Sequence, residues 1–214
     1  MIDVDQQINA VSRHVGTRTL EAGEARTVTV SRTYDATIDD VWDACTNPER
    51  IPRWFAPVSG DLRLGGRYQI EGNAGGAIER CDPPRSFAAT WEYGSDVTWI
   101  ELRLTAAPDG GTRFELEHIA PVDDERWTEF GPGAVGVGWD LGLMGLASHL
   151  SSGAAVAPDE GAAWMASADG ARFMTLSSEG WQQAHAAAGA DEAAARHAAE
   201  RTVAAYTGAP EATE

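Results

Sequence analysis

Lysine is absent from this sequence of 214 residues, so all 16 of its Lys and Arg side chains are arginines. The absence excludes two kinds of chemistry in their standard form. A P-loop uses a lysine to reach the phosphates of a nucleotide, and imine-forming catalysis needs an ε-amine. The sequence therefore gives no basis for a phosphate-cradling NTPase or for a Schiff-base aldolase.

Cysteine is scarce as well, and Cys45 and Cys81 are the two present. They form no CxxC pair, and no His or Cys flanks them at metal-ligand spacing. The five histidines include no HxH or HExxH pair. We therefore expect no disulfide framework, no metal site and no cofactor.

A surplus of positive charge and long apolar runs are also missing. The formal net charge is −17 and the isoelectric point is near 4.5, so the chain would repel phosphate backbones and anionic membrane surfaces. The longest apolar-leaning stretch, residues 134–150, is too short and too rich in glycine for a span of ~20 apolar residues. The first residues lack the basic and apolar regions of a secretory signal. We expect no nucleic-acid partner, no membrane insertion and a cytoplasmic location.

The rest of the composition is that of a globular protein, with 43% hydrophobic and 23% charged residues. Its length fits one domain with appendages. Apolar residues at helical spacing predict a short amphipathic helix over residues 3–15. Alternation of β-favouring residues then predicts a strand over residues 27–34.

A helix start is indicated at Thr37, whose side chain can cap the helix, with Asp39 and Asp40 well placed in the first turn. This helix should run to about Cys45. A second polar cap followed by a proline predicts another short helix within residues 46–55.

Residues 60–119 change to period two, with breaks at Gly-Gly, Pro-Pro and Asp-Gly-Gly that delimit antiparallel strands. Ile100 and Leu102 share an apolar face, whereas Glu101 opposes it and should be solvated, with an arginine as its partner across the strands. Parity places further residues on apolar faces: Phe87, Ala89, Trp91, Tyr93, Leu104, Phe114, Leu116 and His118.

Apolar residues at three- and four-residue spacing predict one long helix over residues 132–150. Its stripe, which should cover the sheet, consists of Val135, Trp139, Leu143, Leu146 and Leu150. The other side is apolar and rich in glycine, so a further layer must bury it. We expect helices over residues 158–206 to supply that layer, including an Ala-rich helix from 191.

These elements divide the chain into four parts. We expect an N-terminal helical extension at 1–25, a central domain at 26–152, a helical C-terminal extension packed on that domain at 153–207, and a frayed tail at 208–214.

Short motifs along the central part occur together in a recognisable order. They are Tyr34-Asp35-Ala36 with Val41-Trp42, Asn47-Pro48-Glu49-Arg50-Ile51-Pro52-Arg53-Trp54-Phe55, Gly65-Gly66-Arg67-Tyr68, Cys81-Asp82-Pro83-Pro84-Arg85 with Trp91-Glu92, Gly111-Thr112-Arg113-Phe114, and Gly138-Trp139. Over about residues 26–150 the chain resembles the START-like, Bet v 1-like superfamily. Within it, the chain is similar to the SRPBCC branch related to the C-terminal domain of the heat-shock-protein ATPase activator.

The resemblance implies an α+β helix-grip fold, in which a curved antiparallel sheet wraps around a long C-terminal helix, here with added N-terminal and C-terminal helices. It also implies a cavity between sheet and helix, which the superfamily uses for lipids, sterols, polyketides and plant hormones. The added segments lie outside the common domain. They could cover the cavity mouth or form the surface of a homodimer.

Parity and the resemblance together give the candidate ligand-binding residues, although core packing alone would explain most of the aromatic ones. They are Trp54, Phe55, Tyr68, Ile70, Phe87, Trp91, Ile100, Leu102, Phe114, Leu116, His118, Val135, Trp139, Leu143 and Leu146. His118 or Tyr68 could orient a ligand, and His118 is the one weak candidate for catalysis. His149 suits the C-terminal end of the long helix.

Three functions stay open from the sequence. The first is binding of a hydrophobic small molecule, such as a lipid, polyketide or aromatic metabolite, without catalysis. The second is a cyclase-like or hydratase-like enzyme that uses the same cavity with His118 as acid or base. The third, ranked last, is a chaperone-linked interaction module that stimulates an ATPase.

Overall fold

The computed structural model describes residues 2–108 and 110–208, which form two compact units. The described residues of the first unit lie within Met1–Val30, Pro121–Leu141 and Ala157–Glu214, and those of the second lie within Ser31–Ala120 and Gly142–Val156. Strand β2 (Gly23–Tyr34) and helix α4 (Gly133–Ser152) contribute residues to both units. The four-part division of the chain with boundaries at 25/26 and 152/153 stays a prediction.

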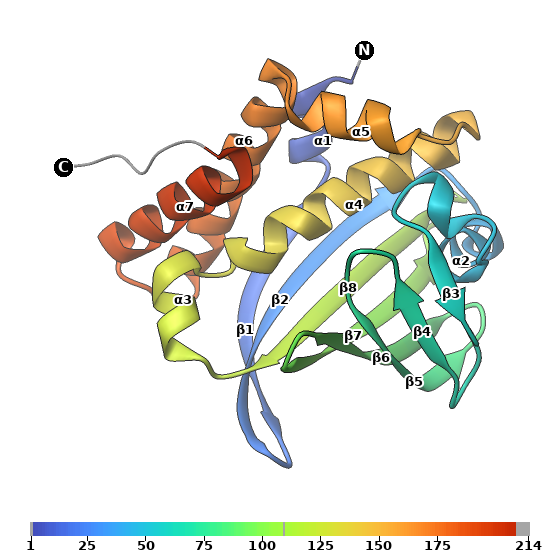
Figure 1. The fold of residues 1–214 in the computed structure, drawn as a ribbon, viewed down its shortest axis with the longest axis horizontal. Coiled ribbons are helices and arrows are strands. Elements are labelled where there is room, and N and C mark those ends of the chain that lie inside the picture. The colour runs from blue at the N-terminus through green and yellow to red at the C-terminus, as the bar shows by residue number, and fades with distance from the viewer. Residues whose placement is uncertain (1, 109, 209–214) are drawn as a thin grey trace. The chain divides into compact units, whose positions relative to one another are not determined.

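The described strands form one eight-stranded sheet in the order β1-β2-β8-β7-β6-β5-β4-β3 (Figure 1). Besides β2, they are β1 (Ser12–Leu20), β3 (Val58–Gly60), β4 (Arg67–Ile70), β5 (Gly75–Asp82), β6 (Ser86–Tyr93), β7 (Asp96–Ala106) and β8 (Thr112–Pro121). From β3 to β8, each strand pairs antiparallel with the next. These are the antiparallel strands that the period-two pattern predicted.

Apolar side chains of β6, β7 and β8 are aligned in rows across the second unit. Leu102 pairs with Phe87 on one side and Leu116 on the other, and Ile100 pairs with His118. Directly paired residues point to the same face of a sheet, so these rows form one continuous apolar face. Leu102 is 1% exposed and lies at its centre.

Helix α2 (Ile38–Thr46) begins as predicted, because the side chain of Thr37 accepts a hydrogen bond from the backbone N–H of Asp40. The second short helix is reduced to a 3₁₀ turn, η1 (Ile51–Arg53). It ends there because the backbone of Trp54 leaves the helical region, with φ of −135°.

The C-terminal half of α4 packs closely against the segment that follows η1. A Cβ at Gly145 would overlap the carbonyl oxygen of Trp54, whereas one at Gly142 would lie 3.7 Å from the ring of Phe55, an ordinary contact. Glycine at 145 therefore allows the helix backbone to approach this segment.

Tyr34 joins α4 to the sheet within the second unit. Its hydroxyl donates to the carbonyl oxygen of Leu143 at 3.1 Å, and its ring meets that of Phe114 edge-on, with centroids 6.1 Å apart. Burial raises the pKa of this phenol, so Tyr34 stays a neutral donor. The helix thus lies against the apolar face, which is the α+β helix-grip fold that the resemblance implied.

Helix α1 (Val4–Asn9) is shorter than the sequence suggested, because strand β1 occupies residues 12–20. The prediction of a helix over residues 3–15 was wrong beyond Asn9. Val11 and Val15 are four residues apart, a spacing that fits period two as well as period 3.6. These residues form a strand because β1 is hydrogen-bonded to β2 in the sheet.

Four further helices belong to the first unit: α3 (Asp124–Phe130), α5 (Pro158–Met165), α6 (Ala168–Ala187) and α7 (Glu192–Thr207). Helices α6 and α7 lie side by side (Figure 1). Trp181 of α6 packs so closely on α4 that a Cβ at Gly136 would overlap its indole. Within this unit, α6 therefore packs directly against the backbone of α4 at Gly136.

Glu101 is 7% exposed, so the expectation that it would be solvated was wrong. Its carboxylate pairs with Arg103 at 2.7 Å and with Arg80 at 3.1 Å. The small side chain of Ala88, which pairs with both Arg80 and Glu101, lets the arginine reach across the intervening strand. The two long arginine side chains cover the carboxylate, which strand parity alone does not reveal.

Candidate functional site

The candidate site lies on the apolar face of the second unit. We use the name sheet wall for the residues of β6, β7 and β8 that form this face around His118, which are Phe87, Trp91, Thr98, Ile100, Leu102, Phe114, Leu116 and His118. The register shows that they share one face. All of them except Thr98 were candidates from the sequence.

His118 is the most distinctive member of the sheet wall, being a titratable group that is 3% exposed. Its Nε2 lies 3.0 Å from Oγ1 of Thr98, and its ring meets that of Trp91 edge-on, with centroids 6.3 Å apart. Burial removes hydration from the charged imidazole and lowers its pKa to about 4. His118 is therefore neutral at pH 7.

Thr98 belongs to the site although the sequence analysis did not include it. Its hydroxyl donates to the carbonyl oxygen of Trp91 at 3.0 Å and also contacts His118. The signal was available, because Thr98 is two residues from Ile100 and so shares its face. A threonine at the end of an apolar row indicates no functional role until its contact with His118 is known.

Strand β4 adds Tyr68 and Ile70, which are two residues apart and so point to the same side. The hydroxyl of Tyr68 donates to the carbonyl oxygen of Thr90 at 2.7 Å. Burial is the main cause that raises the pKa of this phenol, so it too remains protonated at neutral pH. Ile70 is buried, whereas Tyr68 keeps part of its surface exposed.

Several large aromatic side chains of the candidate set are half-buried: Trp54, Phe55, Tyr68, Phe87 and Trp91. In contrast, Leu102, Phe114 and Leu116 are closed off from water. Phe87 and Trp91 are thus partly exposed on the same face of the sheet as these closed-off side chains.

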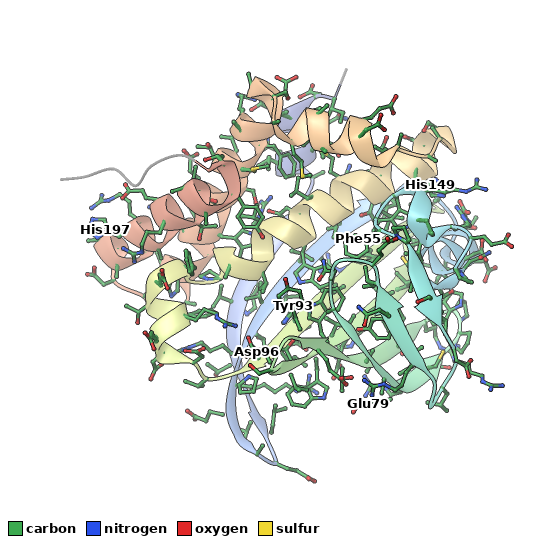
Figure 2. All side chains as sticks on the ribbon, viewed as in Figure 1. Phe55, Glu79, Tyr93, Asp96, His149 and His197 are labelled. Atoms are coloured by element: carbon green, nitrogen blue, oxygen red, sulfur yellow. The ribbon has the colours of Figure 1, made fainter. Side chains whose placement is uncertain are left out.

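Leu143 and Leu146 are buried on the part of α4 that belongs to the second unit. The stripe predicted from the sequence is thus divided, because Val135 and Trp139 lie on the part of α4 that belongs to the first unit. Their role in ligand binding stays a prediction. Tyr93, which parity placed on the apolar face, is the last residue of β6 and is 61% exposed (Figure 2).

His149 has a structural environment near the end of α4. Its Nδ1 lies 3.1 Å from the carbonyl oxygen of Ala154, and its Nε2 accepts from the guanidinium of Arg50 at 3.3 Å. Arg50 also binds Asp40 at 2.6 Å and Asp43 at 3.0 Å. These bonds tie the end of α4 to α2, which agrees with a structural role for His149.

Asp140 on α4 forms a second polar cluster, in the first unit, which sequence analysis missed. It is 1% exposed, and its Oδ2 accepts from Arg13 at 2.8 Å, from Ser177 at 2.5 Å and from Trp181 at 3.2 Å. Burial raises the pKa of this carboxyl, and the three donors oppose that shift. Its partners come from β1 and α6, far away in the sequence, so no local pattern reveals the cluster.

Two further searches cover the residues that the structure describes. Among them, no His, Cys, Asp and Glu side chains gather in groups of three or more that could hold a metal ion. None of the helices in these same ranges has the length and apolar character needed to cross a membrane.

Comparison with protein-family models gives a match over residues 35–151 to "Activator of Hsp90 ATPase homolog 1-like protein". The matched region contains the whole sheet wall and most of α4. The chain belongs to this SRPBCC-type family. This confirms the family that the motifs indicated.

Solved structures agree with this assignment. CalU16 from Micromonospora echinospora is 37% identical over 85% of this chain and 99% of its own, with a TM-score of 0.65 for the crystal structure. Its solution structure covers 84% of this chain and 97% of its own, at the same identity and a TM-score of 0.68. No curated protein matches the chain.

DynU16, described as a protein in the dynemicin biosynthetic locus, is more distant. It is 20% identical over 60% of this chain and 48% of its own, with a TM-score of 0.53. At this identity the likeness shows a shared fold.

Proposed function

We propose that this chain binds a hydrophobic small molecule, such as a lipid, polyketide or aromatic metabolite, against the sheet wall. The observation that carries the proposal is the group of half-buried aromatic side chains, among them Phe87 and Trp91, beside the buried and neutral His118. Members of the superfamily that this family belongs to hold apolar ligands at the corresponding place.

Burial of apolar surface supplies the affinity in this account. Removing about 200 Å² of apolar surface of wall and ligand from water contributes about 5 kcal/mol at roughly 25 cal/mol per Å². Loss of translational and rotational freedom offsets part of this gain. Five kcal/mol alone corresponds to a dissociation constant of about 0.2 mM, and micromolar binding requires more than about 330 Å² of buried apolar surface, so a ligand with several fused rings or a long acyl chain binds much more tightly than a single small ring.

Binding without catalysis is favoured over the cyclase-like or hydratase-like alternative by the state of His118. An imidazole whose pKa is about 4 is in its neutral form at pH 7, so it has no imidazolium proton to give as an acid, and it is a weak acceptor in a proton-transfer step. An efficient acid or base needs a pKa near the working pH. Turnover that depended on His118 at neutral pH would overturn this preference.

A chaperone partner is the second alternative, and the name of the matched family is the observation that favours it. Its test is a pull-down of an Hsp90-type chaperone by the full chain, with the ATPase rate measured in its presence. A stimulated rate would support this function. Absence of both binding and stimulation would remove it.

The binding proposal is tested by a thermal-shift screen of fatty acids, sterols and aromatic polyketides, followed by titration of tryptophan fluorescence. Trp91→Leu should weaken binding of any ligand found by tenfold or more, since Trp91 is half-buried in the sheet wall. Tyr93→Leu, on the same strand but 61% exposed, is the matched control and should leave the affinity unchanged. The proposal fails if no compound binds, or if the two variants behave alike.

A further inference from the structure

Helix α3 lies at the surface of the first unit beside α7, and none of its seven residues is buried (Figure 1). Along the chain it connects strand β8, which carries His118, with helix α4. A helix this short gains little stability from its own backbone or from packing, so a few specific contacts hold it in place. Weakening one of these contacts should therefore loosen the whole helix.

Two of these contacts bind the ends of α3. At the N-terminal end, Arg26 of β2 pairs with Asp124 at 2.5 Å, and its guanidinium lies 4.8 Å from the ring centre of Trp127. At the C-terminal end, Arg201 of α7 donates to two carbonyl oxygens in the last turn of α3, at 2.6 and 2.9 Å. Neither contact involves a histidine, the side chain that ordinarily changes its charge between pH 5 and 8.

The middle of α3 is held by a contact of a different kind. Nε1 of Trp127 donates to Nε2 of His185 on α6 at 3.1 Å, and the two rings meet edge-on, with centroids 5.2 Å apart. An indole nitrogen can only donate, so Nε2 of His185 is unprotonated and the neutral ring carries its hydrogen on Nδ1. A second proton would have to bind to Nε2. The bond to Trp127 and the charged imidazole are therefore mutually exclusive.

The surroundings of His185 disfavour the charged form of its ring. Its Nδ1 is closed off from water and has no hydrogen-bond partner among the residues that the structure describes. Gly131, which ends α3 with a φ of +58°, lies so close that a Cβ there would be 3.2 Å from Nδ1. Burial lowers the pKa of His185, and the positive charge of Arg26 lowers it further. The ring is therefore neutral at pH 7.

Charged groups reach this part of the unit from the elements around His185: Arg26 from β2, Asp124 from α3, Arg201 from α7 and Asp140 from α4. Three of them are engaged with other groups, since Asp124 binds Arg26, Arg201 binds the backbone of α3 and Asp140 binds an arginine of β1. Residues 181–189 of the chain, around His185 itself, include no charged residue. Of the four, Arg26 acts on the pKa of His185, and it acts against the imidazolium.

We propose that Trp127 and His185 form a pH-sensitive latch, in which the neutral imidazole holds α3 in place and protonation of the ring breaks the bond and releases the helix. A released His185 returns towards the ordinary imidazole pKa of about 6.5, above that of the latched ring. Acid therefore favours release. The stabilisation by the latch is complete above about pH 6.5 and is lost as the pH falls through the lowered pKa. This device does not depend on the proposed function.

The latch can be followed by the ¹⁵N–¹H signal of the Trp127 indole between pH 7.5 and 5. This signal, assigned from its absence in Trp127→Phe, should lose the downfield proton shift of a hydrogen-bonded indole with a midpoint below pH 6.5. Trp54 is the internal control, because its indole donates at 2.9 Å to the carbonyl oxygen of Ala44, which does not titrate. A Trp127 signal that stays constant to pH 5, or that moves only together with that of Trp54, would overturn the proposal.

His185→Gln is the matched variant, because the amide oxygen can take the place of Nε2 as an acceptor and does not titrate. The Trp127 signal of this variant should be the same at pH 7.5 and 5. A signal that still moved with the midpoint of the wild type would show that another group titrates, and it would refute the assignment to His185.

Release of the helix itself is measured with a glutamate-specific protease, which can cut α3 after Glu125 and Glu129. Cleavage at these positions, identified by mass spectrometry, should rise severalfold more between pH 7.5 and 5.5 in the wild type than in His185→Gln. The comparison cancels the pH dependence of the protease. Trp127→Phe, which lacks the donor, should be cut severalfold faster than the wild type at pH 7.5. Equal rises in the first pair, or equal rates in the second, would contradict the latch.

Discussion

The burial of His118 makes the stability of this protein depend on pH in a way that can be calculated. The imidazole has a pKa of about 4 in the folded chain, against 6.5 as its ordinary value. The unfolded state therefore binds a proton between these two values while the folded state does not. The stabilisation is complete above about pH 6.5 and is lost as the pH falls through 4.

The size of the effect follows from the two pKa values. Linkage gives a loss of about 2 kcal/mol between pH 7.5 and pH 5, and of about 3 kcal/mol by pH 4. The matched variant is His118→Gln, whose amide can still donate to Thr98 but does not titrate. This variant should lack the pH-dependent loss of unfolding free energy that His118 causes, whatever its stability at pH 7.5.

Urea unfolding at pH 7.5, 6 and 5 provides the assay. The unfolding free energy of the wild type should fall by about 2 kcal/mol more than that of His118→Gln between pH 7.5 and 5. His197→Gln serves as the control for removing a histidine from the chain, because His197 is exposed on α7 (Figure 2). The same pH dependence in wild type and His118→Gln would refute the reasoning.

Two further predictions concern packing and the buried charge. Asp140→Ala should lower the unfolding free energy, measured by urea unfolding, by about 3–5 kcal/mol, because Arg13 is left as an uncompensated buried charge. The double variant with leucine at both Asp140 and Arg13 should recover part of this loss. Gly145→Ala should lower the unfolding free energy by about 1 kcal/mol or more, since the added Cβ would overlap the carbonyl oxygen of Trp54. Gly142→Ala should leave the unfolding free energy unchanged or raise it by up to about 1 kcal/mol, because its Cβ would make an ordinary contact. Equal melting temperatures for the two alanine variants, or an undiminished stability in Asp140→Ala, would contradict these expectations.

The sequence predicts the sheet well because one face of each strand is apolar. Alternation around Ile100 and Leu102 identified the correct buried face, and the cap at Thr37 identified the correct start of a helix. Local patterns failed where they fit two structures. The valines at 11 and 15 are compatible with helix and strand alike, and only the neighbouring strand decides between them.

The candidate site is predictable in its apolar members and not in its polar partners. Parity found His118, but its contact with Thr98 was visible only once the two strands were aligned. Glu101 and Asp140 are buried carboxylates whose compensating arginines come from other elements. Contacts of this kind depend on the tertiary fold, so a single sequence does not contain a readable signal for them.

Chemical-shift mapping with 2-naphthol tests the central claim most directly. When this two-ring aromatic compound is titrated into the ¹⁵N-labelled protein, the largest changes should fall on β6, β7 and β8 around Trp91, Thr98 and His118, including the indole N–H of Trp91. Changes confined to α6 and α7, or a spectrum that does not change at millimolar naphthol, would contradict a ligand site on the sheet wall.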